Sequence, residues 1–302
     1  MTRTVGMRTR GVRERSQRGY GQMSGIGATS RVLLALVLTS GLAAGCGPRT
    51  ADQDLEGFSA EEIFMRGEFE LETSRRATRA LRYFSEVERL YPYSRFARRA
   101  LIMQAYAHHR DRDYEEARAA AQRFLDLYPA DEDAAYAQYL LALSFYDQID
   151  RVGRDQGLTF QALRALRDVI EFYPDTEFAR SAVLKFDLAF DHLAAKEMEI
   201  GRYYLRKRQY AAAINRFRVV VEDFQTTTHT PEALHRLVES FLGLGLTEEA
   251  QTAGAILGHN FQGNPFYDDS FRLLTGQGLA PDAAGEGWLR DIWRQTMRGE
   301  WL

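Results

Sequence analysis

Residues 194–221, AAKEMEIGRYYLRKRQYAAAINRFRVVV, read as two helices joined by a short polar turn. The residues that define the pattern are small, or large and apolar, and recur at helical offsets: Gly201, Tyr204, Tyr210, Ala213, Phe217 and Val220. Where two antiparallel helices cross closely, only a small residue fits at the contact, here Gly201 and Ala213, and the larger side chains fill the space on either side. This spacing is typical of a tetratricopeptide-type helix–turn–helix repeat.

The second-helix pattern of this hairpin recurs along the chain: Ala80, Phe84 and Val87; Ala117, Ala121 and Phe124; Ala162, Leu166 and Val169; and Ala250, Gly254 and Leu257. The marker alanines stand 37, 45, 51 and 37 residues apart. An ordinary repeat has about 34 residues, so every interval carries an insertion. Because one hairpin cannot cover its own apolar face, such copies stack. We therefore predict an all-α, tetratricopeptide-like superhelix of about five helix-turn-helix repeats.

Helix boundaries follow from capping residues and breakers. Side chains are expected to cap helices at these positions: Ser59 (with Glu62), Ser94, Asp113 (with Glu116) and Thr247. Gly243 and Gly245 are expected to form the turn of the last hairpin. Between Thr176 and Arg208 only Gly201 interrupts the pattern, and Gly201 is assigned to a packing contact. One helix of about thirty residues is therefore expected in the fourth repeat.

The N-terminus reads as an export signal. Arg31 precedes an apolar run, residues 32–44, which is too short to span a bilayer comfortably and ends just before Cys46, the single cysteine of the chain. Small residues before such a cysteine resemble a bacterial lipobox, so Cys46 is predicted to be lipidated and to anchor the protein to a membrane. The alternative is a free or buried cysteine behind an uncleaved helix. Two starts remain open, Met1 and Met23, and Met23 is favoured.

Charge is distributed unevenly between this segment and the rest. Residues 1–45 hold seven arginines and one acidic residue, whereas residues 46–302 carry 32 basic and 41 acidic groups. Phosphate binding requires a basic face, so a nucleic-acid partner is not expected.

Several short motifs resemble the BamD family, the lipoproteins of the outer-membrane β-barrel assembly machine. They are Tyr91-Pro92, Tyr128-Pro129, residues 135–139 (AYAQY), 194–197 (AAKE), 203–204 (YY), 212–216 (AAINR) and 264–267 (NPFY). The resemblance covers roughly residues 42–267 and includes the lipobox. Gln225 and Gln262 stand where the family tends to have proline, which leaves the ends of those repeats open. Gly47, rather than aspartate, follows the cysteine, which in lipoproteins of this kind implies transfer to the outer membrane.

The expected organisation has five parts. These are a signal peptide (1–45), the lipidated cysteine with a flexible tether (46–58), repeats 1–3 (59–175), repeats 4–5 (176–267) and a tail (268–302). The tail holds every tryptophan of the chain, Trp288, Trp293 and Trp301, in an amphipathic pattern. It could cap the superhelix, bind another subunit or lie in the membrane interface.

No catalytic or metal-binding constellation stands out. His108 and His109 are adjacent on a helix, so they point about 100° apart and suit one metal poorly. The other histidines lack metal-ligand spacing, and no cofactor is expected. An enzyme with an unrecognised site remains as an alternative class.

Function is therefore expected to lie in two surfaces. The first is a concave peptide groove lined by first-helix residues of repeats 2 and 3: Arg99, Ile102, Tyr106, His109, Tyr136, Tyr139, Leu143 and Tyr146. Its tyrosines suit an extended peptide with aromatic side chains, although some of them could simply pack between repeats. The resemblance implies the ligand, the targeting strand of an unfolded outer-membrane protein.

The second surface is a basic cluster in repeats 4 and 5: Arg202, Arg206, Lys207, Arg208, Arg216 and Arg218. The resemblance implies docking onto the periplasmic domains of the barrel-forming subunit through Arg202, Tyr203, Asn215 and Arg216. It also implies accessory assembly lipoproteins as further partners. Solvated helix faces are the simpler interpretation of the cluster. Another function class also remains, a periplasmic tetratricopeptide lipoprotein that acts as an adaptor for hydrolases or for cell-wall and division proteins.

Overall fold

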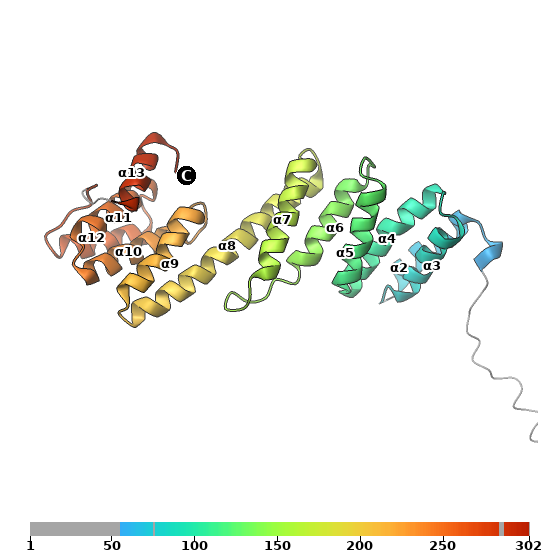
Figure 1. The fold of residues 1–302 in the computed structure, drawn as a ribbon, viewed down its shortest axis with the longest axis horizontal. Coiled ribbons are helices and arrows are strands. Elements are labelled where there is room, and N and C mark those ends of the chain that lie inside the picture. The colour runs from blue at the N-terminus through green and yellow to red at the C-terminus, as the bar shows by residue number, and fades with distance from the viewer. Residues whose placement is uncertain (1–54, 75, 284–286, 302) are drawn as a thin grey trace, which may run out of the picture. The chain divides into compact units, whose positions relative to one another are not determined.

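The polypeptide forms a succession of helical hairpins (Figure 1). A computed structural model describes residues 55–74, 76–283 and 287–301, and throughout these ranges every regular element is a helix. In chain order they are η1 (Leu55–Gly57), α2 (Ala60–Thr73), α3 (Thr78–Leu90), α4 (Arg95–Asp111), α5 (Tyr114–Leu127), α6 (Ala134–Tyr146), α7 (Gly157–Phe172), α8 (Glu177–Arg206), α9 (Tyr210–Asp223), α10 (Thr230–Leu244), α11 (Thr247–Asn260), α12 (Pro265–Thr275) and α13 (Trp288–Arg298). The export signal and Cys46 lie outside the described residues.

The hairpins stack as tetratricopeptide repeats do. Each helix from α2 to α11 packs against the next in the chain, and the first helices of successive hairpins, α2, α4, α6, α8 and α10, also contact one another. The all-α, tetratricopeptide-like fold is thus confirmed. The long helix is also confirmed, because α8 runs for 30 residues and packs against α7 as well as α9.

Close helix crossings depend on glycine, as predicted. A β-carbon on Gly201 of α8 would collide with the ring of Phe217 on α9, and Ala213 beside it is fully buried. The first hairpin repeats this arrangement, since a β-carbon on Gly67 would lie 2.6 Å from the ring of Phe84. The same steric device therefore closes two hairpins that are far apart in the sequence.

The second helices end in one backbone conformation. Tyr91, Tyr128 and Tyr173, each followed by proline, have φ near −133° and ψ between 50° and 55°. Phe224 and Phe261, which precede Gln225 and Gln262, have φ of −129° with ψ of 32° and 46°. The repeats therefore end in the same way with or without proline.

Two of the predicted caps are confirmed. Ser59 accepts a hydrogen bond from the amide of Glu62, whose carboxylate accepts from the Ser59 amide in return. Ser94 caps α4 by accepting from the amide of Ala97 at 3.1 Å.

Three other turn assignments were wrong. Asp113 precedes α5, but its side chain makes no capping hydrogen bond. Thr247 is the first residue of α11 rather than its cap. Gly243 lies inside α10 and not in the turn. Glycine is needed there for packing, since a β-carbon would lie 2.6 Å from the ring of Tyr210. Gly245, with φ of 77°, alone supplies the left-handed turn residue.

The tail packs on the last repeat. Helix α12 contacts α10 and α11, and α13 contacts α11. Leu289, Ile292 and Trp301 are buried in the same core cluster as Phe217 and Val221. The indole Nε1 of Trp301 donates a hydrogen bond to the carbonyl of Val221 at 3.2 Å, and the side chain is only 4% exposed. The tail therefore covers an apolar face that a further repeat would otherwise cover.

Candidate functional site

Aromatic side chains from three first helices meet between α6 and α8. The rings of Tyr136 and Tyr139 lie 5.2 and 5.6 Å from the ring of Phe178 on α8. The ammonium of Lys185, two turns further along α8, lies 5.7 Å from the ring of Tyr139 and 5.8 Å from that of Tyr146. We call this set, with Tyr106 of α4, the tyrosine face.

The tyrosine face is partly dehydrated. Burial, with smaller contributions from repulsion by the neighbouring Tyr106, Asp133 and Tyr139, raises the pKa of the Tyr136 hydroxyl to about 12. The neutral phenol is therefore the form present at physiological pH, and it can donate or accept a hydrogen bond.

The remaining groove residues are placed differently. Arg99 lies over the ring of Phe64 at 4.6 Å, on the side of α4 that faces α2. Ile102 is 5% exposed and belongs to the core, so it offers no surface to a ligand. His109 Nε2 lies 3.1 Å from the carboxylate of Asp147. Leu143 is half-buried on α6. The structure thus gathers the predicted tyrosines but not the whole predicted set.

Two leucines were missed by the sequence analysis. Leu184 and Leu188 of α8 follow Ile102 and Tyr106 by 82 residues each and are 68% and 62% exposed. Thr176 caps α8 as Ser94 caps α4. Aligning the sequences of the two helices at these caps would have identified both leucines. They extend the apolar first-helix surface onto the fourth repeat.

The predicted docking residues lie on α8 and α9, and the two arginines among them pair with carboxylates. Arg216 of α9 pairs with Glu197 of α8 at 3.0 Å, and its side chain remains 43% exposed. Arg202 of α8 pairs with Glu232 of α10 at 2.8 Å. Tyr203 and Asn215 are exposed. These residues are available at the surface, but the two ion pairs join different pairs of helices.

The net positive charge of the predicted basic cluster is reduced by carboxylates that lie against it in the structure. Arg218 pairs with Glu222 at 2.8 Å, in addition to the pairs formed by Arg202 and Arg216. Three of the six cations in the predicted cluster are therefore matched by carboxylates, and such partly exposed pairs contribute at most about 1 kcal/mol each.

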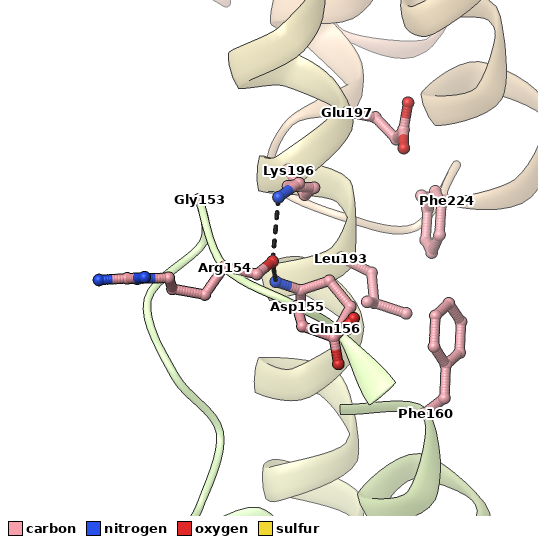
Figure 2. A pocket seen from close by; sticks show the side chains of 9 residues that line it. All are labelled: Gly153, Arg154, Asp155, Gln156, Phe160, Leu193, Lys196, Glu197 and Phe224. Atoms are coloured by element: carbon pink, nitrogen blue, oxygen red, sulfur yellow. Dashed lines mark hydrogen bonds between the residues drawn. The ribbon is translucent and has the colours of Figure 1, made fainter. Parts of the chain in front are cut away.

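A cavity of about 590 Å³ opens beside the middle of α8 (Figure 2). Its apolar wall consists of Phe160 of α7, Leu193 of α8 and Phe224 after α9. The loop 153–156 and the side chains of Lys196 and Glu197 complete the lining. We call it the α8 cavity. Sequence reasoning missed it because its lining comes from four separate segments.

Polar contacts hold the walls of the α8 cavity. The ammonium of Lys196 donates to the carbonyl of Arg154 at 3.0 Å and so fixes the loop to α8 (Figure 2). Asp155 accepts from the Gly157 amide at 3.0 Å. The Arg154 guanidinium points away from the cavity in Figure 2. Both carboxylates of the lining, those of Asp155 and Glu197, thus have partners.

The described residues contain no group of three or more histidine, cysteine, aspartate or glutamate residues arranged to hold a metal ion. Across these residues there is also no helix with the length and apolar character needed to cross a membrane.

Comparisons with known proteins agree on one family. Residues 57–256 match the family YfiO, described as outer membrane lipoprotein. The chain is 48% identical over 252 residues to the outer membrane protein assembly factor BamD of Caulobacter vibrioides, covering 83% of this chain and 82% of that protein. It is 38% identical over 245 residues to BamD of Rickettsia prowazekii, covering 81% and 97%. With BamD of Neisseria meningitidis the identity is 29%, over 78% and 93% of the two chains. The chain therefore belongs to the BamD family of outer membrane lipoproteins.

Proposed function

We propose that this protein is a lipid-anchored component of the outer-membrane β-barrel assembly complex, acting as a non-catalytic scaffold at the periplasmic face of the outer membrane. The observation that carries the proposal is the 48% identity to a protein named outer membrane protein assembly factor. Cys46 supplies the anchor, the barrel-forming subunit docks on the C-terminal repeats, and accessory lipoproteins bind elsewhere.

The tyrosine face is the surface proposed to recognise unfolded outer-membrane proteins. Their transmembrane strands alternate apolar and polar residues over about ten positions. Tyr136, Tyr139 and Phe178 offer ring contacts to the apolar side of such a strand, and the phenol hydroxyls offer hydrogen bonds.

Affinity purification from detergent-solubilised envelope tests the docking step. The wild-type chain is expected to recover the barrel-forming subunit, and Arg216→Glu to lower that recovery by roughly tenfold with helicity unchanged. Glu197→Gln is the matched control, because it removes the intramolecular pair at 3.0 Å yet keeps the arginine. Equal losses in both variants would assign Arg216 a structural role instead.

The proteins that copurify with the wild-type chain also test whether it belongs to the β-barrel assembly complex. Recovery of hydrolases or cell-wall proteins without a barrel-forming subunit would contradict the proposal and favour an adaptor. Cys46→Ala is expected to move the protein from the membrane fraction to the soluble fraction, and unchanged fractionation would contradict the anchor.

A further inference from the structure

Lys185 of α8 is the positively charged member of the tyrosine face. Its ammonium lies 5.7 Å from the ring centre of Tyr139 and 5.8 Å from that of Tyr146, within the range in which an aromatic ring attracts a cation. The two tyrosines are seven residues apart on α6, about two helical turns, so they share one side of that helix. These contacts position the ammonium between α6 and α8, but they do not neutralise its charge.

Within the described ranges Lys185 forms no ion pair with a carboxylate. The positions three and four residues away on α8 hold no acidic residue: Ser181, Ala182, Leu188 and Ala189. Asp187, two positions on, leaves α8 on a different side. On α6, Asp133 precedes the first turn, and Asp147 follows the last turn and lies 3.1 Å from His109 Nε2. The protein therefore supplies no counter-charge to this ammonium.

The groups around Lys185 are hydrogen-bond donors and apolar surface. In the part of the chain that the structure describes, no hydroxyl of the tyrosine face is hydrogen-bonded to protein, unlike that of Tyr91, which donates to the Phe58 carbonyl at 2.6 Å. The phenol of Tyr136, with its pKa raised to about 12 by burial, stays protonated and can donate. Leu188, one turn after Lys185, is 62% exposed. This combination is complementary to an anionic group beside an apolar one.

From these relations we infer that Lys185 determines what the tyrosine face binds, by pairing with a carboxylate of the bound polypeptide that stands beside an apolar side chain. A half-buried ammonium without a counter-charge gains most from an anionic ligand. In an extended chain the carboxylate is either the C-terminal one, next to the last side chain, or that of an acidic residue two positions away on the same face. The inference rests on the proposed recognition of unfolded outer-membrane proteins and names the chemical group that is read.

Four fluorescein-labelled peptides of about ten residues test it, each an alternating serine and valine strand that ends in phenylalanine. One pair ends in a free carboxylate or in an amide. The other pair is amidated and carries glutamate or glutamine two positions before the phenylalanine. Binding to the full chain in detergent is followed by anisotropy. In at least one pair the carboxylate peptide is expected to bind roughly fivefold more tightly than its neutral counterpart, and added salt should reduce the difference. The pair that shows the difference identifies the source of the carboxylate.

Variants of α8 assign the preference to Lys185. Lys185→Gln should abolish it, and Lys185→Arg, which keeps the charge, should retain it. Arg180→Gln is the matched control, because it removes the same charge from an exposed position of the same helix, five residues away and about 140° around the axis. Circular dichroism should show equal helicity in all three variants. Equal binding within both peptide pairs, a preference that survives Lys185→Gln, or an equal loss in Arg180→Gln would overturn the inference.

The outcome also separates this inference from the proposed function. If the two members of each pair bind equally and Tyr139→Ala weakens them all, the proposed recognition stands and only the role of Lys185 fails. If no peptide binds the wild-type chain, recognition at the tyrosine face fails and the role of Lys185 fails with it. Recovery of the barrel-forming subunit tests membership of the assembly complex independently of both.

Discussion

Gly201 of α8 leaves no space for a β-carbon beneath the ring of Phe217 on α9. The ring is fully buried among the core residues of the C-terminal repeats. The close crossing of these two helices therefore depends on the absence of a side chain at Gly201. The fit can be tested by adding a methyl group at Gly201 and by reducing the side chain at Phe217.

Gly201→Ala is expected to destabilise the protein. In an open helix interior, alanine is favoured over glycine by about 1 kcal/mol, but overpacking a closed contact costs about 1–3 kcal/mol. Because the ring of Phe217 is fully buried, we expect the second effect to dominate, with a net loss of up to about 2 kcal/mol in the free energy of unfolding, measured in urea. Combining the change with Phe217→Leu should recover part of the loss. A gain in stability would contradict the steric account.

Arg208→Gly is expected to stabilise the turn between α8 and α9. Arg208 has φ of 58°, a left-handed conformation that costs about 1–2 kcal/mol with a β-carbon. Glycine removes that cost but adds disorder to the unfolded chain, so the net gain should be about 0.5–1 kcal/mol. Thermal unfolding measures it. Arg180→Gly, an exposed position inside α8, is the control and should lose about 1 kcal/mol.

Trp301 is expected to hold the tail in place. Trp301→Ala removes a buried ring and should destabilise the C-terminal repeats by about 3–5 kcal/mol. Trp301→Phe keeps most of the ring and loses the hydrogen bond to Val221, so about 1 kcal/mol is expected. Urea denaturation followed by tryptophan fluorescence gives both values. A shift of the native emission on adding lipid vesicles would instead favour a membrane-bound tail.

His235 is expected to make stability fall in mild acid. Burial lowers the pKa of its imidazole below 6.5, and its Nδ1 lies 2.8 Å from the hydroxyl of Ser270. The charged groups that act on the ring are Glu239, Arg236, Asp269 and Glu232.

The sign of the effect follows from proton binding. The unfolded chain binds a proton at His235 more readily, so stability is full above pH 6.5 and declines as the pH falls from there towards the lowered folded pKa. Comparing unfolding free energies at intervals across this range tests it. His235→Gln should flatten the decline. An equally steep decline without His235 would contradict the assignment.

Much of the fold could be predicted because local sterics dictate it. A close helix crossing was predicted from Gly201 and Ala213, and it is present. A long α8 was predicted from the 51-residue interval between marker alanines, and it is also present. Helix periodicity is a property of a few neighbouring residues, so one sequence suffices to read it.

The features that escaped prediction depend on residues far apart in the chain. Asp113 is a local exception, because it had the sequence of a capping residue and yet its side chain does not cap α5. Half of the predicted basic cluster is matched by carboxylates, and Glu232 stands 30 residues from Arg202. The α8 cavity joins a loop to three other segments, and loops carry no periodicity that would place their side chains.

Because α8 is continuous, it also fixes the orientation of the repeat that packs against its first half relative to the repeat that packs against its second half. Its first half is packed by α7 and its second half by α9, with no turn between them to absorb a change in length. One residue inserted near its midpoint would rotate everything that follows by about 100° and advance it by about 1.5 Å. Insertions and deletions should therefore be tolerated in the loop 147–156 far more readily than in this helix, where only a shift close to whole turns preserves the mutual orientation of the two ends.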